Sequence, residues 1–326
     1  MKYLLLLCVL ALLSFFVLGV GRYPLEYRQI LEVLLSPWAT TLDERLRYII
    51  LEVRLPRIVL AIFVGASLGI CGASFQSIFR NPLASPDILG VASGAGFGAA
   101  LAILLGLNIY FLTLFAFAFG ILTLILVLLI VRDSNNRIMI ILGGIIISAL
   151  FQSFISLLKY IADPQDALPA MTYWLLGSLN VSDFHQLIFC CLGMLFGGII
   201  IFVYRWKHNL LMLDDNEAKS LGLNIRSLRI GLIFASTLMV SCVVSICGII
   251  GWVGLIIPHI ARMIGGSNMS SVMSLSLVLG AIFMLVIDTL SRSLSSEEIP
   301  ISILSAVIGA LFFIVILYRF KGVMKL

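Results

Sequence analysis

Two short polar segments interrupt a chain that is otherwise almost entirely apolar, and their residues are the ones whose types could bind a partner or do chemistry. Residues 80–87 read RNPLASPD, and their two prolines disfavour helix at the residues that precede them. Such a turn is tolerated inside a membrane only where protein buries it or where it lines water. Residues 207–229 hold the acidic side chains Asp214, Asp215 and Glu217.

The second segment has the pattern of a short amphipathic helix. Asp214 can cap such a helix, and Asp215 and Glu217 would lie in its first turn, where carboxylates interact favourably with the helix dipole. Gly222 suits the exit of that helix. Three small or apolar residues could form one face: Leu213, Ala218 and Leu221. The segment therefore predicts a docking element for a partner protein, and a plain solvated loop helix is the alternative.

Catalytic and metal-binding patterns are missing from the sequence. It contains no G-x-x-x-x-G-K-[ST] phosphate loop, no HExxH and no Ser-His-Asp arrangement. Three scattered histidines and six cysteines inside apolar runs lack metal-ligand spacing. We expect a non-catalytic chain that holds no metal and no cofactor, so any ATPase that drives it must be another chain.

Long uncharged runs must position these polar segments. Apolar residues make up 61% of the 326 residues and charged residues only 11%. A hydrocarbon core about 30 Å thick needs roughly 20 apolar helical residues, so the sequence predicts an all-α polytopic membrane protein in one domain, residues 1–326. We expect ten spans, the first of them uncleaved: 3–21, 56–79, 88–106, 109–131, 138–160, 186–205, 229–250, 252–264, 270–290 and 300–319. Glycines four apart, such as Gly94 and Gly98, predict close helix packing.

The charges indicate the orientation. With both termini in the cytoplasm, most basic residues fall on the cytoplasmic side, as the positive-inside rule requires. The net charge of +5 then reflects membrane topology and gives no reason to expect nucleic-acid binding. Residues 22–54 become an outer amphipathic connector. Lys159, Asp288 and Arg292 fall near span ends, and the near absence of mid-membrane charge counts against an ion-coupled transporter.

Several motifs, in the same order, resemble the permease family of binding-protein-dependent ABC importers for iron chelates, haem and vitamin B12. They are RLPR at 54–57, GxxxQxxxRNPLAxPxxLG at 72–90, GA at 94–95, AxxLG at 218–222, GxxGWVGLIIPHIAR at 248–262, EIPI at 298–301 and IGA at 308–310. The family commonly has proline at the positions of Ile249 and Leu311 and glycine at that of Ser302. These departures concern local helix geometry.

The resemblance implies a type II ABC importer permease fold with about ten transmembrane helices in the cytoplasmic (inner) membrane. It implies a homodimer with the translocation path at the dimer axis, two cytoplasmic ATPase subunits that bind the ATP and Mg, and a periplasmic or lipid-anchored binding protein. Residues 207–229 would be the coupling helices. Their ATPase-contacting residues would be Leu213, Asp214, Asp215, Glu217, Ala218, Leu221 and Gly222.

Two further sets of residues take roles from the resemblance. Arg54, Arg57 and Arg292 are similar to arginines that meet glutamates of the binding protein, and a guanidinium fork suits a carboxylate. Snorkelling at the membrane surface is the alternative for them. The inner gate would comprise Asn81, Pro82, Leu83, Asn135 and Asn136. A plain polar loop is the alternative there.

The sequence thus predicts a permease that imports a metal chelate, with an iron–siderophore complex or haem expected first and cobalamin or molybdate possible. The rival function is an ion-coupled secondary transporter that works without an ATPase. A membrane-anchored assembly protein with no through-path is a third class.

Overall fold

Helices are the only regular elements among residues 2–21, 23–36, 43–131, 136–181, 183–222 and 224–320, the part of the chain that this computed structural model describes. Within that part, seven helices are long and apolar enough to cross a membrane: α1 (Lys2–Gly19), the continuous helix Glu44–Ile78 that ends in α4 (Leu55–Ile78), α6 (Ile109–Ile130), α7 (Arg137–Ile161), α9 (Phe184–Val203), α12 (Ile225–Cys247) and α14 (Met269–Ser293). Three other helices take the remaining predicted positions: α5 (Val91–Leu104), α13 (Val253–Gly265) and α15 (Ile301–Phe320). The all-α membrane fold is confirmed, and an apolar helix lies at each of the ten predicted positions.

The outer connector differs from its prediction. It contains α2 (Tyr27–Leu35) and α3 (Glu44–Tyr48), and a π-helical stretch, Ile49–Arg54, joins α3 to α4 without a break. The second spanning helix therefore begins at Glu44 and not near residue 56. Proline is typical of a first helical turn, which is why Pro56 suggests a start in the sequence. The wider π turn before Pro56 accommodates the missing N–H, so the helix runs on.

Glycines allow the closest helix contacts. A Cβ added to Gly65 of α4 would lie 2.1 Å from the carbonyl oxygen of Gly280 in α14, and the converse distance is the same. On α5, a Cβ at Gly98 would lie 2.4 Å from the Phe115 carbonyl oxygen of α6. Close backbone approach between small residues stabilises membrane helix pairs through dispersion contacts. The predicted packing role of the glycine spacing is confirmed.

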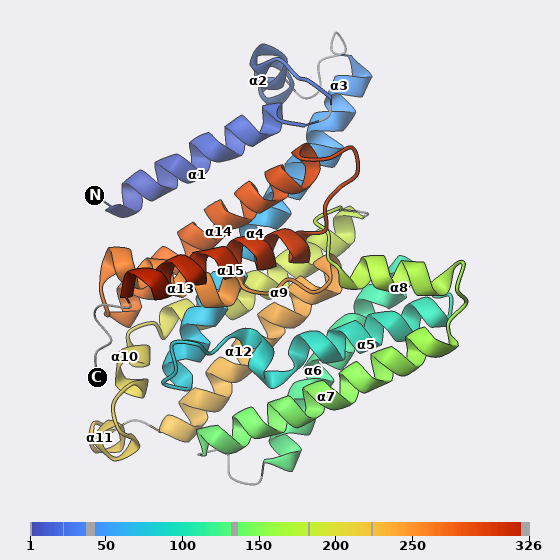
Figure 1. Cartoon of the computed structure of the whole chain (residues 1–326). Coiled ribbons are helices and arrows are strands. Elements are labelled where there is room, and N and C mark those ends of the chain that lie inside the picture. The colour runs from blue at the N-terminus through green and yellow to red at the C-terminus, as the bar shows by residue number, and fades with distance from the viewer. Residues whose placement is uncertain are drawn as a thin grey trace.

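The helices form one elongated bundle whose two ends differ (Figure 1). α12 lies inside and contacts α4, α6 and α9, while α1 lies along the outside of α14. The short helices α10 (Lys207–Leu211) and α11 (Asp215–Ser220) lie at one end, and α2 and α3 lie at the other. We call these the α11 end and the α2 end. A hydrogen bond from Lys2 Nζ to the Ile264 carbonyl oxygen, 3.0 Å, places the start of α1 beside the turn after α13.

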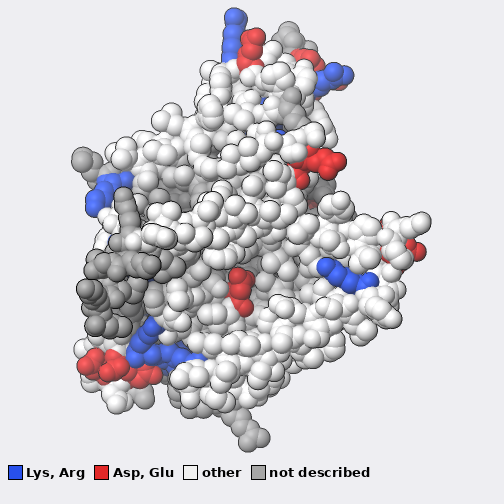
Figure 2. Space-filling model, in the orientation of Figure 1, with Lys and Arg blue, Asp and Glu red and all other residues white. Residues whose placement is uncertain are grey.

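The surface between the two ends is largely uncharged. Figure 2 shows a broad white band with charged side chains gathered mainly toward the ends. Beyond its first turn, α9 exposes apolar residues, as a lipid-facing helix requires: Phe189, Leu192, Phe196, Ile199 and Val203. α8 (Ala167–Leu175) is a short helix in the connection between α7 and α9.

Candidate functional site

The predicted docking segment forms two short helices, α10 and α11, joined by a turn. The Asp214 carbonyl oxygen accepts a hydrogen bond from the Ala218 amide at 2.9 Å, so Asp214 directly precedes the first turn of α11. The Asp214 amide in turn donates to Glu217 Oε2 at 3.4 Å. Gly222 has a φ of 79°, the left-handed conformation that glycine adopts easily at a helix exit. The local geometry therefore follows the predicted pattern.

The predicted apolar face of this segment is wrong, because its members point in different directions. Ala218 is fully buried against the bundle, whereas Leu213 and Leu221 are 38% and 61% exposed. Asp214 and Asp215 divide in the same way, with side chains 84% and 34% exposed. A helix turns by about 100° per residue, so neighbours in sequence face different surroundings. The exposed surface formed by α11 and its flanking residues thus combines apolar side chains, Leu213 and Leu221, with acidic ones.

Asp215 joins α11 to three spanning segments. Its carboxylate pairs with Arg80, just after α4, at 2.8 Å, with Arg229 of α12 at 3.3 Å, and with Arg137 at the start of α7. Partial burial on its own raises the pKa of Asp215, but the hydrogen bond from Arg80 and the charges of Arg137 and Arg229 outweigh it and hold the pKa below its usual value. The Asp215 carboxylate therefore connects α11 to α4, α7 and α12.

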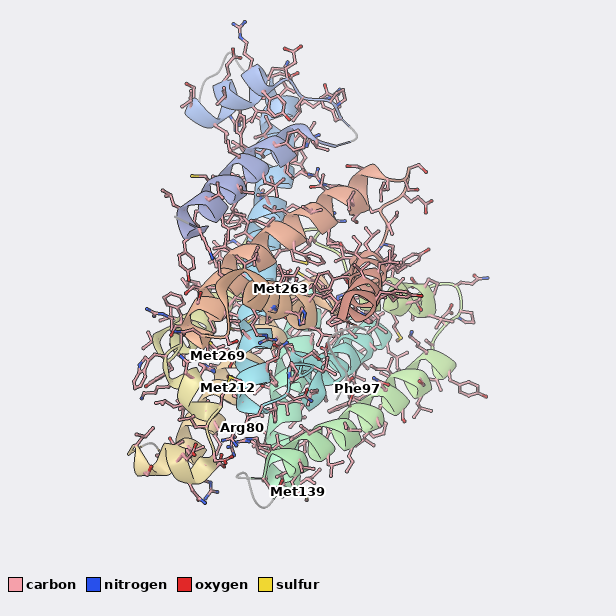
Figure 3. All side chains as sticks on the ribbon, turned by 60° about the vertical axis from the view of Figure 1, so that its left-hand side comes forward. Arg80, Phe97, Met139, Met212, Met263 and Met269 are labelled. Atoms are coloured by element: carbon pink, nitrogen blue, oxygen red, sulfur yellow. The ribbon has the colours of Figure 1, made fainter. Side chains whose placement is uncertain are left out.

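Arg80 also connects the end of α4 to α10 and to Asp214. It has a φ of 49°, uncommon for a residue with a side chain, and its Nε donates to the Leu211 carbonyl oxygen at 2.9 Å. Its Nη1 also pairs with Asp214 at 3.2 Å. Figure 3 shows Arg80 and Met139, near the start of α7, at the α11 end of the bundle. Sequence reasoning missed Arg80, Arg137 and Arg229 as partners of Asp215, although Arg80 lies in the RNPLA motif.

His208 fixes α10 to α4. It is fully buried, and its Nδ1 lies 2.6 Å from Ser77 Oγ. Ser77 Oγ also lies 2.8 Å from the Ser74 carbonyl oxygen, so the hydroxyl links α10 to the last turns of α4. Burial lowers the pKa of His208 to about 3, which keeps the imidazole neutral at physiological pH.

The predicted gate residues fall at the α11 end. Asn81 Oδ1 accepts the Leu83 amide at 2.9 Å and closes the turn, leaving Pro82 and Leu83 exposed. Asn136 caps α7, because its side-chain oxygen accepts hydrogen bonds from the amides of Ile138 and Met139. It also borders a shallow depression of about 430 Å³ that Arg80, Arg137, Asp214 and Asp215 line. Asn135 lies outside the described residues. The gate role stays a prediction.

α7 carries an exposed polar stripe that sequence reasoning missed. Gln152, Ser153 and Ser156 are exposed at its middle, whereas Ile147 and Phe151 are buried. The hydroxyls of Ser153 and Ser156 donate to carbonyl oxygens of their own helix, and Leu150, Phe154 and Leu157 are exposed beside them. The face is therefore mixed, and its polar groups offer hydrogen-bonding sites within an apolar surface. The spacing of Gln152 and Ser156, four residues apart, was a usable signal.

The three predicted docking arginines lie together at the α2 end, but they are buried and bonded within the chain. Arg54, Arg57 and Arg292 are 6%, 6% and 8% exposed. Arg57 pairs with Asp288 at 2.7 Å and with Glu298 at 2.9 Å. This arrangement is an internal network, and it also differs from snorkelling.

The other two arginines hold the end of α1. Arg292 pairs with Asp288 at 3.2 Å and donates to the carbonyl oxygens of Val17 and Val20. Arg54 donates to the carbonyl oxygens of Leu18 and Tyr23. Sequence reasoning missed Asp288 as the partner of Arg57 and Arg292, although the spacing of four residues between Asp288 and Arg292 could have indicated it. The docking role of the arginines stays a prediction.

Within the described ranges, no group of three His, Cys, Asp or Glu side chains is close enough to hold a metal ion.

Comparison with known proteins gives consistent matches over nearly the whole chain. The model of the FecCD transport family matches residues 6–319. The molybdate import system permease protein MolB of Haemophilus influenzae is 45% identical over 320 residues, which is 97% of this chain and 94% of the relative. A probable iron chelatin transport system permease of Helicobacter pylori is 37% identical over 85% of each chain. A solved inward-facing structure described as of the metal-chelate ABC transporter type is 42% identical, with a TM-score of 0.86, and covers 97% of this chain and 98% of the other.

Proposed function

Because this chain belongs to the FecCD transport family, we propose that it is the membrane-spanning subunit of a binding-protein-dependent importer that works as a homodimer and is driven by two cytoplasmic ATPase subunits. The chain is a multi-pass ABC importer permease for substrates of the metal-chelate type. It catalyses no covalent step, and ATP and Mg belong to the partner. The α11 end faces the cytoplasm in this proposal, and both termini lie on that side.

One observation carries the proposal: α11 faces outward with an acidic and apolar surface while Asp215 anchors it inward to three arginines. The outward residues are Leu213, Asp214, Glu217 and Leu221. An exposed helix with mixed apolar and charged side chains suits a groove of a partner protein. Conformational change in the ATPase subunits would displace this surface, and the ion pairs of Asp215 would transmit the displacement to α4, α7 and α12.

The polar stripe of α7 supports a path between two copies. Gln152, Ser153 and Ser156 are uncharged and make only weak hydrogen bonds with a passing solute. A path of this kind releases its cargo readily, while the binding protein supplies the affinity. The gate of Asn81, Pro82, Leu83 and Asn136 lies at its cytoplasmic end.

We expected an iron chelate or haem as the cargo, and the relatives favour a different order. The molybdate permease is 45% identical over 97% of the chain, against 37% over 85% for the iron chelatin permease. We propose a molybdate-like oxyanion as the cargo and keep an iron chelate as the second candidate. Neutral hydroxyl and amide groups can donate hydrogen bonds to either.

Docking of the binding protein requires a rearrangement at the α2 end. Arg54, Arg57 and Arg292 now donate to partners within this chain. In the proposal they exchange some of these partners for carboxylates of the binding protein, and charge-assisted pairs of this kind gain geometric specificity.

Transport in proteoliposomes tests the proposal. The chain is reconstituted with and without its ATPase subunits, loaded binding protein is added outside, and uptake of molybdate and of a ferric chelate is followed. We expect uptake only with the ATPase and ATP, and molybdate to be taken up. Uptake driven by a proton or sodium gradient without ATPase would establish the rival secondary transporter, and uptake of the ferric chelate alone would reverse the order of cargoes.

A further inference from the structure

A groove of about 390 Å³ lies between α9 and α12 at the α11 end. It borders the predicted coupling segment at Gly222, but the proposed transport path and the outward residues Leu213, Asp214, Glu217 and Leu221 do not line it. Six of its lining residues matter here: Ile200, Tyr204, Lys207, Ser227, Gly231 and Leu232. The first three come from α9 and the residues after it, and the last three come from α12. The groove is polar toward α11 and apolar toward the middle of the bundle.

The polar end holds donors that the chain does not use. Lys207 Nζ lies 4.5 Å from the centre of the Tyr204 ring and 5.7 Å from that of Trp206. In the part of the chain that the structure describes, Lys207 Nζ has no carboxylate partner, and the hydroxyl groups of Tyr204 and Ser227 make no hydrogen bond. One cation and two hydroxyl groups are thus available to an anionic group.

The apolar end is open. A Cβ added at Gly231 would meet no heavy atom within 4 Å, so this glycine leaves room beside Ile200 and Leu232. Helical rise places Leu232 about 12 Å from Asn224 along α12. The rest of α9 exposes apolar side chains, so the groove lies at the edge of a lipid-facing surface. Tyr204 and Trp206 are aromatic residues of the kind that gather at the membrane–water interface.

We propose that this groove binds an anionic phospholipid, with its phosphate group against Lys207, Tyr204 and Ser227 and the upper part of an acyl chain beside Gly231. Charge complementarity favours this occupant, because basic pockets between membrane helices attract anionic headgroups. Gly222 and Asn224, which connect α11 with α12, border the same groove. The bound lipid stabilises the connection between α11 and α12. Its effect on coupling rests on the proposed function, whereas its binding does not.

Native mass spectrometry of the purified full-length chain tests the site. Phosphatidylglycerol is titrated against the wild type, Lys207→Gln and Gly231→Leu, with Lys159→Gln, at the far end of α7, as the matched control. We expect Lys207→Gln to weaken binding about five-fold, the effect of one interfacial lysine, and Gly231→Leu to weaken it at least as much. Lys159→Gln should bind as the wild type does. Unchanged thermal unfolding shows that the variants fold.

Three results would overturn the site. Phosphatidylglycerol binding that is the same in Lys207→Gln and the wild type removes the headgroup contact. Equal binding of phosphatidylcholine shows that the anionic charge is irrelevant. Full displacement of phosphatidylglycerol by inorganic phosphate indicates a free-phosphate site and not a lipid site. Since no ATPase is present in this experiment, its failure is independent of any failure of the importer proposal.

Discussion

Asp214 and Asp215 are neighbours in sequence and both pair with Arg80, but their side chains differ in exposure. Asp214 is mostly exposed, whereas Asp215 lies among Arg80, Arg137 and Arg229. The first is available to a partner protein, and the second holds the helix to the bundle. Assigning both to ATPase contact, as the sequence pattern suggests, overlooks this division.

Replacing Asp215 with Asn should destabilise the chain. The substitution leaves three arginines close together without their shared carboxylate, and we expect a loss of about 1–2 kcal/mol, reduced from the buried-pair value because the site is one third exposed. Asp214→Asn is the matched control and should change the stability little. Thermal unfolding in detergent measures both. Equal midpoints for the two variants would contradict the anchoring role of Asp215.

His208 should make stability depend on pH. Its pKa is about 3 in the folded chain against 6.5 for an ordinary histidine, so the unfolded chain binds the extra proton first as the pH falls. The contribution of neutral His208 to the free energy of unfolding is fully present above pH 6.5. Below that pH the free energy of unfolding declines by up to about 1.4 kcal/mol per pH unit. His208→Asn, which can still form a hydrogen bond with Ser77, should remove this decline.

Unfolding at pH 7 and pH 5 measures the effect, with the exposed His185→Asn as the control. The control should keep the decline of the wild type. A decline of the same size in His208→Asn would show that another group is responsible.

At the scale of elements, α7 and α9 are both apolar spans of similar length, and their exposed faces distinguish them. α7 exposes Gln152, Ser153 and Ser156 among apolar residues such as Leu150, whereas the middle of α9 exposes only apolar residues such as Leu192 and Phe196. The first face is suited to water and the second to lipid. The translocation path should therefore follow α7.

Cysteine labelling checks this assignment in the assembled importer. Ser153→Cys and Ser156→Cys should react with a membrane-impermeant thiol reagent, because they line water. Leu192→Cys and Phe196→Cys should react no faster than the parent chain, which carries its own exposed Cys8. Faster labelling of the α9 positions than of the α7 positions would place the path elsewhere.

At the scale of the whole molecule, hydropathy located all ten helices because each must bury a continuous apolar length. The start of the second helix was missed because a π turn accommodates Pro56, and local propensity does not show that turn. The pairing of Arg57 with Asp288 joins residues 231 positions apart, so only the folded bundle reveals it. Which residues of α11 face the bundle depends on the rotation of the helix about its axis. A six-residue helix is too short for the sequence pattern to show that rotation.

In the proposed importer, this chain supplies the membrane-spanning bundle, and the ATPase subunits move that bundle through α11. A variant that alters the outward side of α11 and keeps Asp215 separates ATPase binding from the anchoring of α11. Asp214 and Glu217 are exposed acidic residues on that side.

Binding of the cytoplasmic ATPase to the double variant Asp214→Lys, Glu217→Lys tests this claim most directly, with Lys159→Gln as a folded control. The variant should unfold at nearly the wild-type temperature, bind the ATPase at least about ten-fold more weakly, as the loss of 1.4 kcal/mol or more requires, and lose ATP-driven uptake. An ATPase that binds the variant and the wild type with the same dissociation constant would contradict the account.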